Sequence, residues 1–520
     1  MRAGLRFLTV MKPIVTIFEG DIWTANPRQP RAASIGIDSN GMIAAVESVP
    51  ERLAAEFPNA KRTRLPSRAL GIPAFHDAHN HWGFAAFDHA ESLVGVSSIG
   101  DAYERLSLRA EKNPDGWVVG FGWNTHLLPL AQSDLDRVST TRPVAVFDKS
   151  THAVQLNGAG VKEVREAFDA AVRDGHPGTL VEGRLLESSN LVFGAMRLPS
   201  AALEKSLMDL QGRYLSVGIA SLDDMDVLTP QILDSLQDLY TSRRLTIPCH
   251  GFIDFGRFSK SALPEPRSDG AFRLVGMKSY MDGALGARSA LMDQPFIGEG
   301  GRGVRLLDRE CFRRRFDLAV ERGYRHVALH AIGDRAVADA TSYLYSVAGN
   351  AVVDRLRIEH FQLADRVDRE RCFEAGIAVC MQPNFTSDVA DYADRLGERA
   401  WKLCEHRSVL DSGALLTFGS DGMPTGPIHG LRCAVEHPNP AQRLSVEESL
   451  RAYTIDACRG SCTDDRRGSL TVGNEANLAV LNRDIVKEGR IDADVVVMAT
   501  IVNGEVRHLD PQWQSSFGTT

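Results

Sequence analysis

Residues 71–81 read GIPAFHDAHNH, an apolar run that ends in two histidines separated by one residue. A short apolar run of this kind is typical of a strand buried in a parallel sheet. Because residues two apart on a strand point to the same side, the imidazoles of His79 and His81 can reach one metal ion. The pair alone is weak evidence, since a lone His-x-His is more often structural or exposed than a metal site.

Seven further runs of this kind follow, each ending in a polar residue or a turn and then continuing into a helix-like segment. This alternation is the pattern of parallel β/α units. Eight units are what a closed barrel requires, so the sequence predicts an α/β fold of the (β/α)8, or TIM barrel, type. The eight predicted strands are residues 71–81, 219–224, 246–253, 274–282, 326–334, 356–363, 377–382 and 415–421.

Both ends of the chain show a different sequence pattern, in which short β-prone runs are separated by turns. Asn40-Gly41 lies between two such runs and is a strong hairpin signal. We expect both termini together to form one small β-sandwich. The interval after the first barrel strand is too long for a simple connection, which predicts an inserted subdomain. The expected parts are 12–70 and 465–511 (sandwich), 71–83 (first barrel strand), 84–206 (insertion) and 207–460 (remaining barrel).

Polar residues with metal-binding side chains fall at the ends of several other predicted strands. His330 ends the fifth strand, His360 the sixth and Asp421 the eighth. In a barrel these strand ends meet at one face, where active sites are built. Each residue alone could be a satisfied buried histidine or a capping aspartate, but their joint placement indicates a metal centre.

Lys278 is unusual because it lies on the fourth predicted strand, where nearly every residue should be apolar. A buried ammonium beside cations is costly, so the lysine must be displaced, deprotonated or chemically changed. Addition of carbon dioxide would turn it into a carbamate, an anionic ligand able to bridge two metals. The simpler alternative is an ion pair with Asp282 at the barrel rim.

The stretch 71–81 resembles the first-strand motif of the amidohydrolase superfamily, and its closest match is the amidohydrolase 3, or YtcJ-like, branch. The resemblance extends over nearly the whole chain, including the terminal strands. Departures at Asn477, Asp223 and residues 122–126 leave the substrate open. The other matching motifs are Lys278 with 282–288, 330–336, Arg-Ile-Glu-His at 357–360, Gln382-Pro383, Gly-Ser-Asp at 419–421, 468–481 and 502–504.

The resemblance implies a catalytic metal centre. His79, His81 and Asp421 would bind one divalent ion. His330 and His360 would bind a second, with carboxylated Lys278 between the two. Two zinc ions are expected, although iron, manganese, cobalt or nickel would also suit these ligands. A metal-activated hydroxide would then cleave an amide or other C–N bond of an N-acyl or N-formyl substrate, with Asp421 as the proton shuttle.

Six further residues are candidate substrate contacts, because they flank the metal motifs or lie in the insertion. Ordinary packing is the alternative for the aromatic residues among them. His152 ranks first, because together with Asn157 it resembles a family segment that faces the site. The candidates are Trp82, Trp123, His152, Tyr280, Arg288 and Gln382.

Two other functions compete with this one. The first is a deaminase of the same superfamily that uses one metal, but such an enzyme does not need Lys278. The second is a scaffold or regulatory protein without activity, because a fold never guarantees a function. All six ligand positions carry suitable side chains, which favours the enzyme.

Composition narrows the choice of partners. The formal net charge of −8 and a pI near 6.0 provide no basic field for nucleic acid or an anionic membrane, so a small-molecule substrate is expected. The eight cysteines form no C-x-x-C pair, which favours reduced thiols in the cytoplasm. No apolar run has signal-peptide or bilayer-spanning length, and Met11 is an alternative start. Whether the chain forms a homo-oligomer stays open.

Overall fold

Eight parallel strands form a nearly closed barrel in the computed structural model, which describes residues 13–124, 128–173, 178–227, 229–255, 263–298, 301–516 and 518–519. Their order around the barrel follows their order along the chain, which confirms the predicted (β/α)8 fold. The strands are β6 (Phe75–Asn80), β13 (Ile219–Asp224), β14 (Cys249–Asp254), β16 (Phe272–Tyr280), β17 (His326–Ala331), β18 (Arg355–His360), β19 (Ala378–Met381) and β20 (Leu416–Phe418).

The last strand returns to the first through both backbone and side-chain bonds. The amide of Asp421 donates to the carbonyl oxygen of His79 over 2.7 Å. The amide and hydroxyl of Ser420 donate to the two carboxylate oxygens of Asp77 over 2.8 and 2.6 Å. A side chain at Gly419 would overlap the backbone of His79, so glycine permits this close approach. The metal-ligand candidates of β6 and β20 thus meet at this seam.

The predicted first strand is divided between two sheets, which corrects the expectation of one strand over 71–81. Residues Leu70–Pro73 form β5 in the terminal sheet, and β6 begins only at Phe75. The change occurs at Ala74, whose amide donates to Asn477 O over 2.9 Å, whereas the amide of Phe75 donates to Gly218 O over 2.9 Å. The chain thus passes directly from the terminal sheet into the barrel at Ala74, and this short connection holds the two sheets together.

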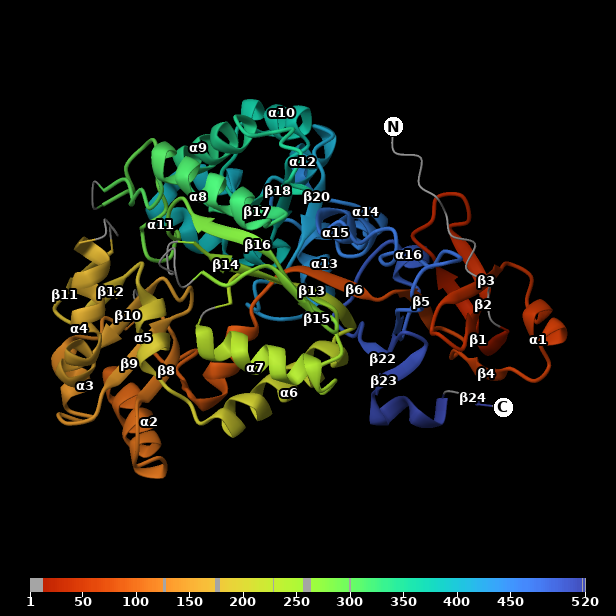
Figure 1. Ribbon diagram of the computed structural model, residues 1–520, viewed down its shortest axis with the longest axis horizontal. Coiled ribbons are helices and arrows are strands. Elements are labelled where there is room, and N and C mark those ends of the chain that lie inside the picture. Colours follow the sequence, from red (N-terminus) through yellow and green to blue (C-terminus); the bar gives the residue numbers. More distant parts are fainter. Residues whose placement is uncertain are drawn as a thin grey trace.

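Strands from both ends of the chain share one nine-stranded sheet, where the sequence predicted a small β-sandwich built from both termini. It lies on the right in Figure 1, at the opposite end of the molecule from the insertion. Its side chains form a core of their own around Phe18, Ile35 and Leu478. The strands are β1 (Ile14–Trp23), β2 (Arg31–Asp38), β3 (Ile43–Glu47), β4 (Lys61–Arg64), β5, β21 (Leu478–Leu481), β22 (Val497–Val502), β23 (Glu505–Leu509) and β24 (Gly518–Thr519). A short helix, α1 (Arg52–Glu56), packs beside β3 and β2.

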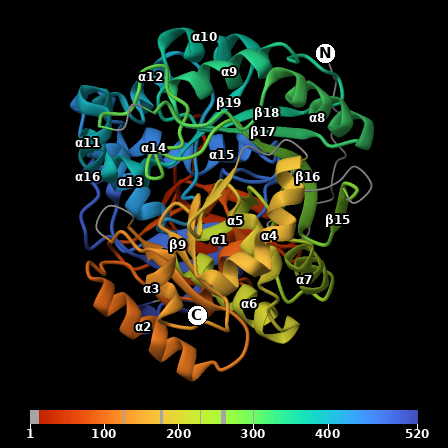
Figure 2. The same ribbon diagram turned by 90° about the vertical axis from the view of Figure 1, so that its left-hand side faces the viewer.

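The segment between β6 and β13 folds around a sheet of its own. Figure 2 shows this orange and yellow part in front of the barrel. It contains β7 (Glu91–Ser92), β8 (Val118–Trp123), β9 (Val144–Asp148), β10 (Ala153–Leu156), β11 (Thr179–Val181) and β12 (Arg184–Leu186). Its helices are α2 (Ile99–Lys112), α3 (Gln132–Asp136), α4 (Gly158–Arg173) and α5 (Ser189–Ala195), with η1 (Trp82–His89) as the entry from the barrel.

Helices cover the outside of the barrel, and the sequence marks several of their ends. Asp308 and Asp365 accept the amides of Cys311 and Asp368 at the starts of two helices. Gly323 and Gly376 end the same helices in the left-handed conformation. The main outer helices are α6 (Ser200–Ser216), α7 (Pro230–Thr241), α8 (Arg309–Arg322), α9 (Asp334–Tyr345), α10 (Arg366–Ala375), α12 (His406–Asp411), α13 (Pro427–Val435), α14 (Val446–Ala452) and α15 (Ile455–Gly460). A short strand, β15 (Arg267–Asp269), pairs antiparallel with β16, and two short helices, α11 (Ala393–Leu396) and α16 (Ile485–Glu488), follow β19 and β21.

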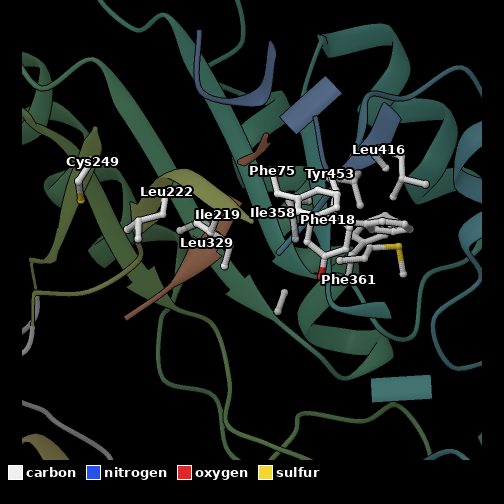
Figure 3. Packing of buried hydrophobic residues seen from close by; sticks show 14 of the residues in the cluster. Phe75, Ile219, Leu222, Cys249, Leu329, Ile358, Phe361, Leu416, Phe418 and Tyr453 are labelled. Atoms are coloured by element: carbon white, nitrogen blue, oxygen red, sulfur yellow. The ribbon is translucent and has the colours of Figure 1, made fainter. Parts of the chain in front are cut away.

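Aromatic and aliphatic side chains fill the space between the barrel and its outer helices. Figure 3 shows Phe75, Phe418 and Tyr453 clustered there; the ring of Tyr453 lies 6.1 Å from that of Phe75 and 5.5 Å from that of Phe418. This packing anchors the two strands at the barrel seam. Among the described residues, none of the helices combines the length and the apolar character that a membrane crossing demands.

Candidate metal centre

The structure brings all six predicted metal ligands to one end of the barrel. Each side chain is buried. His79 lies on β6 and His81 directly after it, Lys278 lies on β16, and His330, His360 and Asp421 lie on or just after β17, β18 and β20. Parallel strands end at one face, so positions as far apart in the sequence as His79 and Asp421 converge here. 

The ligand atoms of three of these residues are close enough to share one ion. Those of His79, His360 and Asp421 lie within 4.8 Å of one another. Asp421 Oδ1 lies 2.9 Å from His81 Nε2 and 3.6 Å from His79 Nε2. The ring of His330 lies 4.4 Å from that of His360, between centroids. Imidazoles and a carboxylate around one point suit a divalent metal.

Two hydrogen bonds orient the histidines. Nδ1 of His79 lies 2.7 Å from Glu359 Oε2, and Nδ1 of His360 lies 2.7 Å from Gln382 Oε1. These contacts leave the Nε2 atoms to face the centre. Partners of this kind fix the ring and the tautomer of metal-binding histidines.

A buried arginine, Arg357, holds the Glu359 carboxylate that orients His79. Arg357 donates from Nε to Glu359 Oε1 over 2.8 Å and from Nη2 to Ala78 O over 2.5 Å. It also pairs with Asp223. The sequence carried a signal for these residues, because Arg357 and Glu359 are charged residues two apart on a buried strand. Their positioning role was missed by the sequence analysis, which used them only as part of a motif.

Burial sets the protonation of the cluster. It lowers the pKa of His79, His330 and His360 well below the ordinary value, so these imidazoles are neutral and keep a lone pair for a metal. Burial acts to raise the pKa of Asp421, but the nearby His79, His81 and Lys278 outweigh it and lower that pKa. The carboxylate is therefore ionised.

Lys278 is 1% exposed, and Nζ donates to Met225 O over 3.3 Å. Nζ also lies 4.7 Å from the centre of the Tyr280 ring. Among the described residues the ammonium forms no ion pair within 4.0 Å, and the alternative pairing with Asp282 is absent. Instead, Asp282 accepts the amides of Leu291, Ile332 and Gly333. Burial lowers the pKa of Lys278, which favours the free amine.

A cavity of about 160 Å³ opens beside the cluster, and His330, His360 and Asp421 form part of its wall. Two predicted substrate contacts, Trp123 and His152, also line it. Its other walls come from the insertion, the loop after β16 and the segment after β19. The last of these supplies Phe385, Asp388, Asp391, Tyr392 and Arg395, which the sequence analysis did not single out.

His152 is held by a carboxylate from the same insertion. Its Nδ1 lies 2.7 Å from Glu187 Oε2, and its ring lies 5.3 Å from that of His330. Burial opposes the charged form, but Glu187 outweighs it and raises the pKa of His152 to about 9. The imidazole is therefore protonated at neutral pH and lines the cavity as a charged group.

The other four predicted contacts do not line this cavity, and their role as substrate contacts stays a prediction. Trp82 is fully buried, with its ring 5.0 Å from that of Tyr214, because its position on η1 turns it into the core. Gln382 bonds His360, as described above. The hydroxyl of Tyr280 donates to Asp226 over 3.0 Å, and Arg288 Nη1 donates to Ile297 O over 2.9 Å. The polar ends of Tyr280, Arg288 and Gln382 are thus turned to protein groups.

A barrel with neutral histidines, an ionised aspartate and a lysine converging at its carboxyl end defines a metal-dependent hydrolase. The family model described as "Amidohydrolase family" matches residues 69–508, so this chain belongs to the amidohydrolase family. This confirms the sequence-based prediction of a hydrolase that acts on C–N bonds other than peptide bonds. The family implies a divalent metal.

Three relatives match nearly the full chain. Protein LONG AFTER FAR-RED 3 of Arabidopsis thaliana is 28% identical over 94% of this chain and 90% of its own length. YtcJ of Bacillus subtilis (strain 168), provisionally named an amidohydrolase, is 26% identical over 94% and 98%. The N-substituted formamide deformylase of Arthrobacter pascens is 27% identical over 96% and 99%. The predicted YtcJ-like membership is thereby confirmed.

The fold also matches a solved structure. An uncharacterized metal-dependent hydrolase from Pyrococcus horikoshii OT3 superposes with a TM-score of 0.73, with 95% of this chain and 100% of that chain covered. The two sequences are 22% identical, so the likeness concerns the fold.

Proposed function

We propose that this protein hydrolyses the C–N bond of a small N-acyl or N-formyl amide at a centre of two divalent ions. The observation that carries the proposal is the meeting of His79, His360 and Asp421 within ligand distance beside a cavity. The relative named as a formamide deformylase supports the substrate class.

Each candidate ligand has a role in this proposal. His79, His81 and Asp421 would hold one ion, and His330 and His360 the other. Lys278 would lie between them as a carbamate, formed when neutral Nζ attacks carbon dioxide and releases a proton. Zinc is the favoured metal for these ligands, and iron, manganese, cobalt and nickel are alternatives. When bound, such ions would supply Lewis acidity that acidifies water and polarises a carbonyl group.

Asp421 would move the proton. Its ionised carboxylate borders the cavity, so it can accept a proton from the attacking water. It would then donate this proton to the nitrogen that leaves as the C–N bond breaks. Water and amide thereby become a carboxylic acid and an amine.

The cavity walls would orient the substrate. Trp123, Phe385 and Tyr392 offer apolar surface to the group attached to the nitrogen or acyl carbon. His152, held by Glu187, would donate a hydrogen bond to the carbonyl oxygen as negative charge develops on it. The modest size of the cavity favours a small-molecule substrate.

The test is a metal count combined with a substrate screen. Protein purified without chelator is analysed for transition metals and assayed with N-formyl and N-acetyl derivatives of alkyl and aryl amines. About two metals per chain with amine release supports the proposal. About one metal with release of ammonia from an aminated ring would favour the deaminase, and no metal after reconstitution would favour a scaffold.

A further inference from the structure

A second cavity lies at the other end of the barrel from the metal centre. Its volume is about 350 Å³. Its walls include Ser221 of β13, His250 of β14 and Arg273 of β16, at or near the amino ends of these strands. The metal-ligand candidates lie at the carboxyl ends, so the two cavities are separated by the barrel interior.

Positive charge dominates this second cavity. Arg243, Arg273, Arg466 and Arg467 line it, and Glu475 is the one carboxylate among the described residues of its wall. Glu475 is already paired, with Arg466 over 2.7 Å and with Arg467 over 2.5 Å. Glu475 offsets one of these two positive charges, and Arg243 and Arg273 add two more.

These two arginines are exposed, and their guanidinium groups form no hydrogen bond or ion pair with any described residue. Two like charges on one small cavity repel each other and attract a counter-charge. The planar donors of arginine match the oxygens of phosphate and carboxylate groups.

The inner part of the cavity carries a buried polar group. His250 is 9% exposed, and its buried Nδ1 has no hydrogen-bond partner among the described residues. The nearest carboxylate oxygen, Asp223 Oδ1, lies 3.9 Å from His250 Nδ1, which is too far for a hydrogen bond. Burial lowers the pKa of His250 to about 3, so the ring is neutral and offers one donor and one acceptor.

We propose that this cavity binds an anionic small molecule through its phosphate or carboxylate group, with Arg243 and Arg273 as the charged donors and His250 at the inner end. This site is separate from the metal centre and does not depend on the proposed amide hydrolysis.

The test is calorimetric titration of metal-loaded, full-length protein with inorganic phosphate and, separately, with succinate at low salt. The double variant R243Q/R273Q removes both charges, and R28Q/R68Q removes two exposed arginines in the terminal β-domain as a matched control. Wild type and control are expected to bind one of the two probes saturably, and R243Q/R273Q to bind it roughly tenfold more weakly or worse. Binding of phosphate would show that the cavity recognises a phosphate group, and binding of succinate that it recognises a carboxylate group.

Phosphate bound at the metal centre would be common to all three proteins and would cancel in this comparison. Circular dichroism spectra without added anion should be equal in the three proteins, which shows that the fold is intact whether or not the protein hydrolyses amides. Equal affinity of R243Q/R273Q and wild type for both probes, or no saturable binding of either probe, would overturn the proposal.

Discussion

Glu359 Oε2 lies 2.7 Å from Nδ1 of His79, on the strand that also ends in His360. One strand therefore supplies a metal-ligand candidate and the group that orients another. The Glu359 carboxylate is in turn held by Arg357 and, through it, by Asp223. The geometry of the centre thus depends on a buried charge network that contains no metal ligand.

Replacing Glu359 with glutamine should weaken metal binding about 10- to 100-fold, because His79 loses the carboxylate that fixes its ring and raises its basicity. Competition with a fluorescent chelator measures this affinity. The control is Glu310→Gln, which changes the same group on the exposed face of α8. Equal metal affinity in E359Q and wild type would show that the contact does not orient the ligand.

Asp421→Asn should keep the fold and much of the metal but lower kcat by about 10²- to 10⁴-fold, since the amide cannot accept and return a proton. Metal analysis and steady-state kinetics on the same sample separate the two effects. Near-native turnover in D421N would refute the shuttle role.

Lys278→Ala should lose both metal and activity. Short carboxylates added with bicarbonate are expected to restore part of the activity, because they can occupy the space of the carbamate. Lys402→Ala, on the surface, controls for the loss of a lysine. An unmodified lysine seen at high resolution together with two bound metals would exclude the carbamate bridge.

Gly276→Ala should destabilise the barrel by about 1–3 kcal/mol, because a methyl group there would overlap the ring of Phe252. Thermal unfolding of the metal-loaded protein measures the change. Gly212→Ala, where α6 leaves open space, is expected to be neutral or slightly stabilising. Similar unfolding temperatures for both variants would contradict the packing argument.

The free energy of unfolding of the Asp368→Asn variant, relative to that of wild type, should increase as the pH rises. Burial, with help from Asp365, raises the pKa of Asp368 to about 7. A raised carboxyl pKa favours the folded state at low pH, and this contribution is lost between about pH 4 and 7. Asparagine does not ionise, so the stability of D368N relative to wild type should increase across that window. Asp317→Asn, on exposed α8, is the control; a flat difference for D368N would contradict the assignment.

Much of the fold could be predicted because strand signals are local. The alternation of apolar runs and helices indicated eight barrel strands, and each predicted run overlaps an observed strand. The division of residues 71–81 at Ala74 could not be predicted, because it depends on Asn477 and Gly218, which lie far away in the sequence. Which sheet a strand residue bonds to leaves no periodic pattern in the sequence of that strand.

The metal-ligand candidates were readable for the same local reason: each lies at or near the end of a strand, and the barrel rule places such ends on one face. The cavity walls were readable only in part, since Trp123 and His152 line the cavity but the other four predicted contacts do not. Trp82 and Trp123 have the same side chain, yet one packs in the core and the other lines the cavity.

The sequence by itself therefore determined the class of fold, the family and the set of residues available for a metal. Only the tertiary structure decided which neighbours orient them, as Gln382 does for His360. It also decided which cations have no partner among the described residues, as is the case for Arg243 and Arg273. The physical reason is range: backbone periodicity acts over a few residues, whereas hydrogen bonding, burial and charge pairing depend on distances that only the packed chain sets.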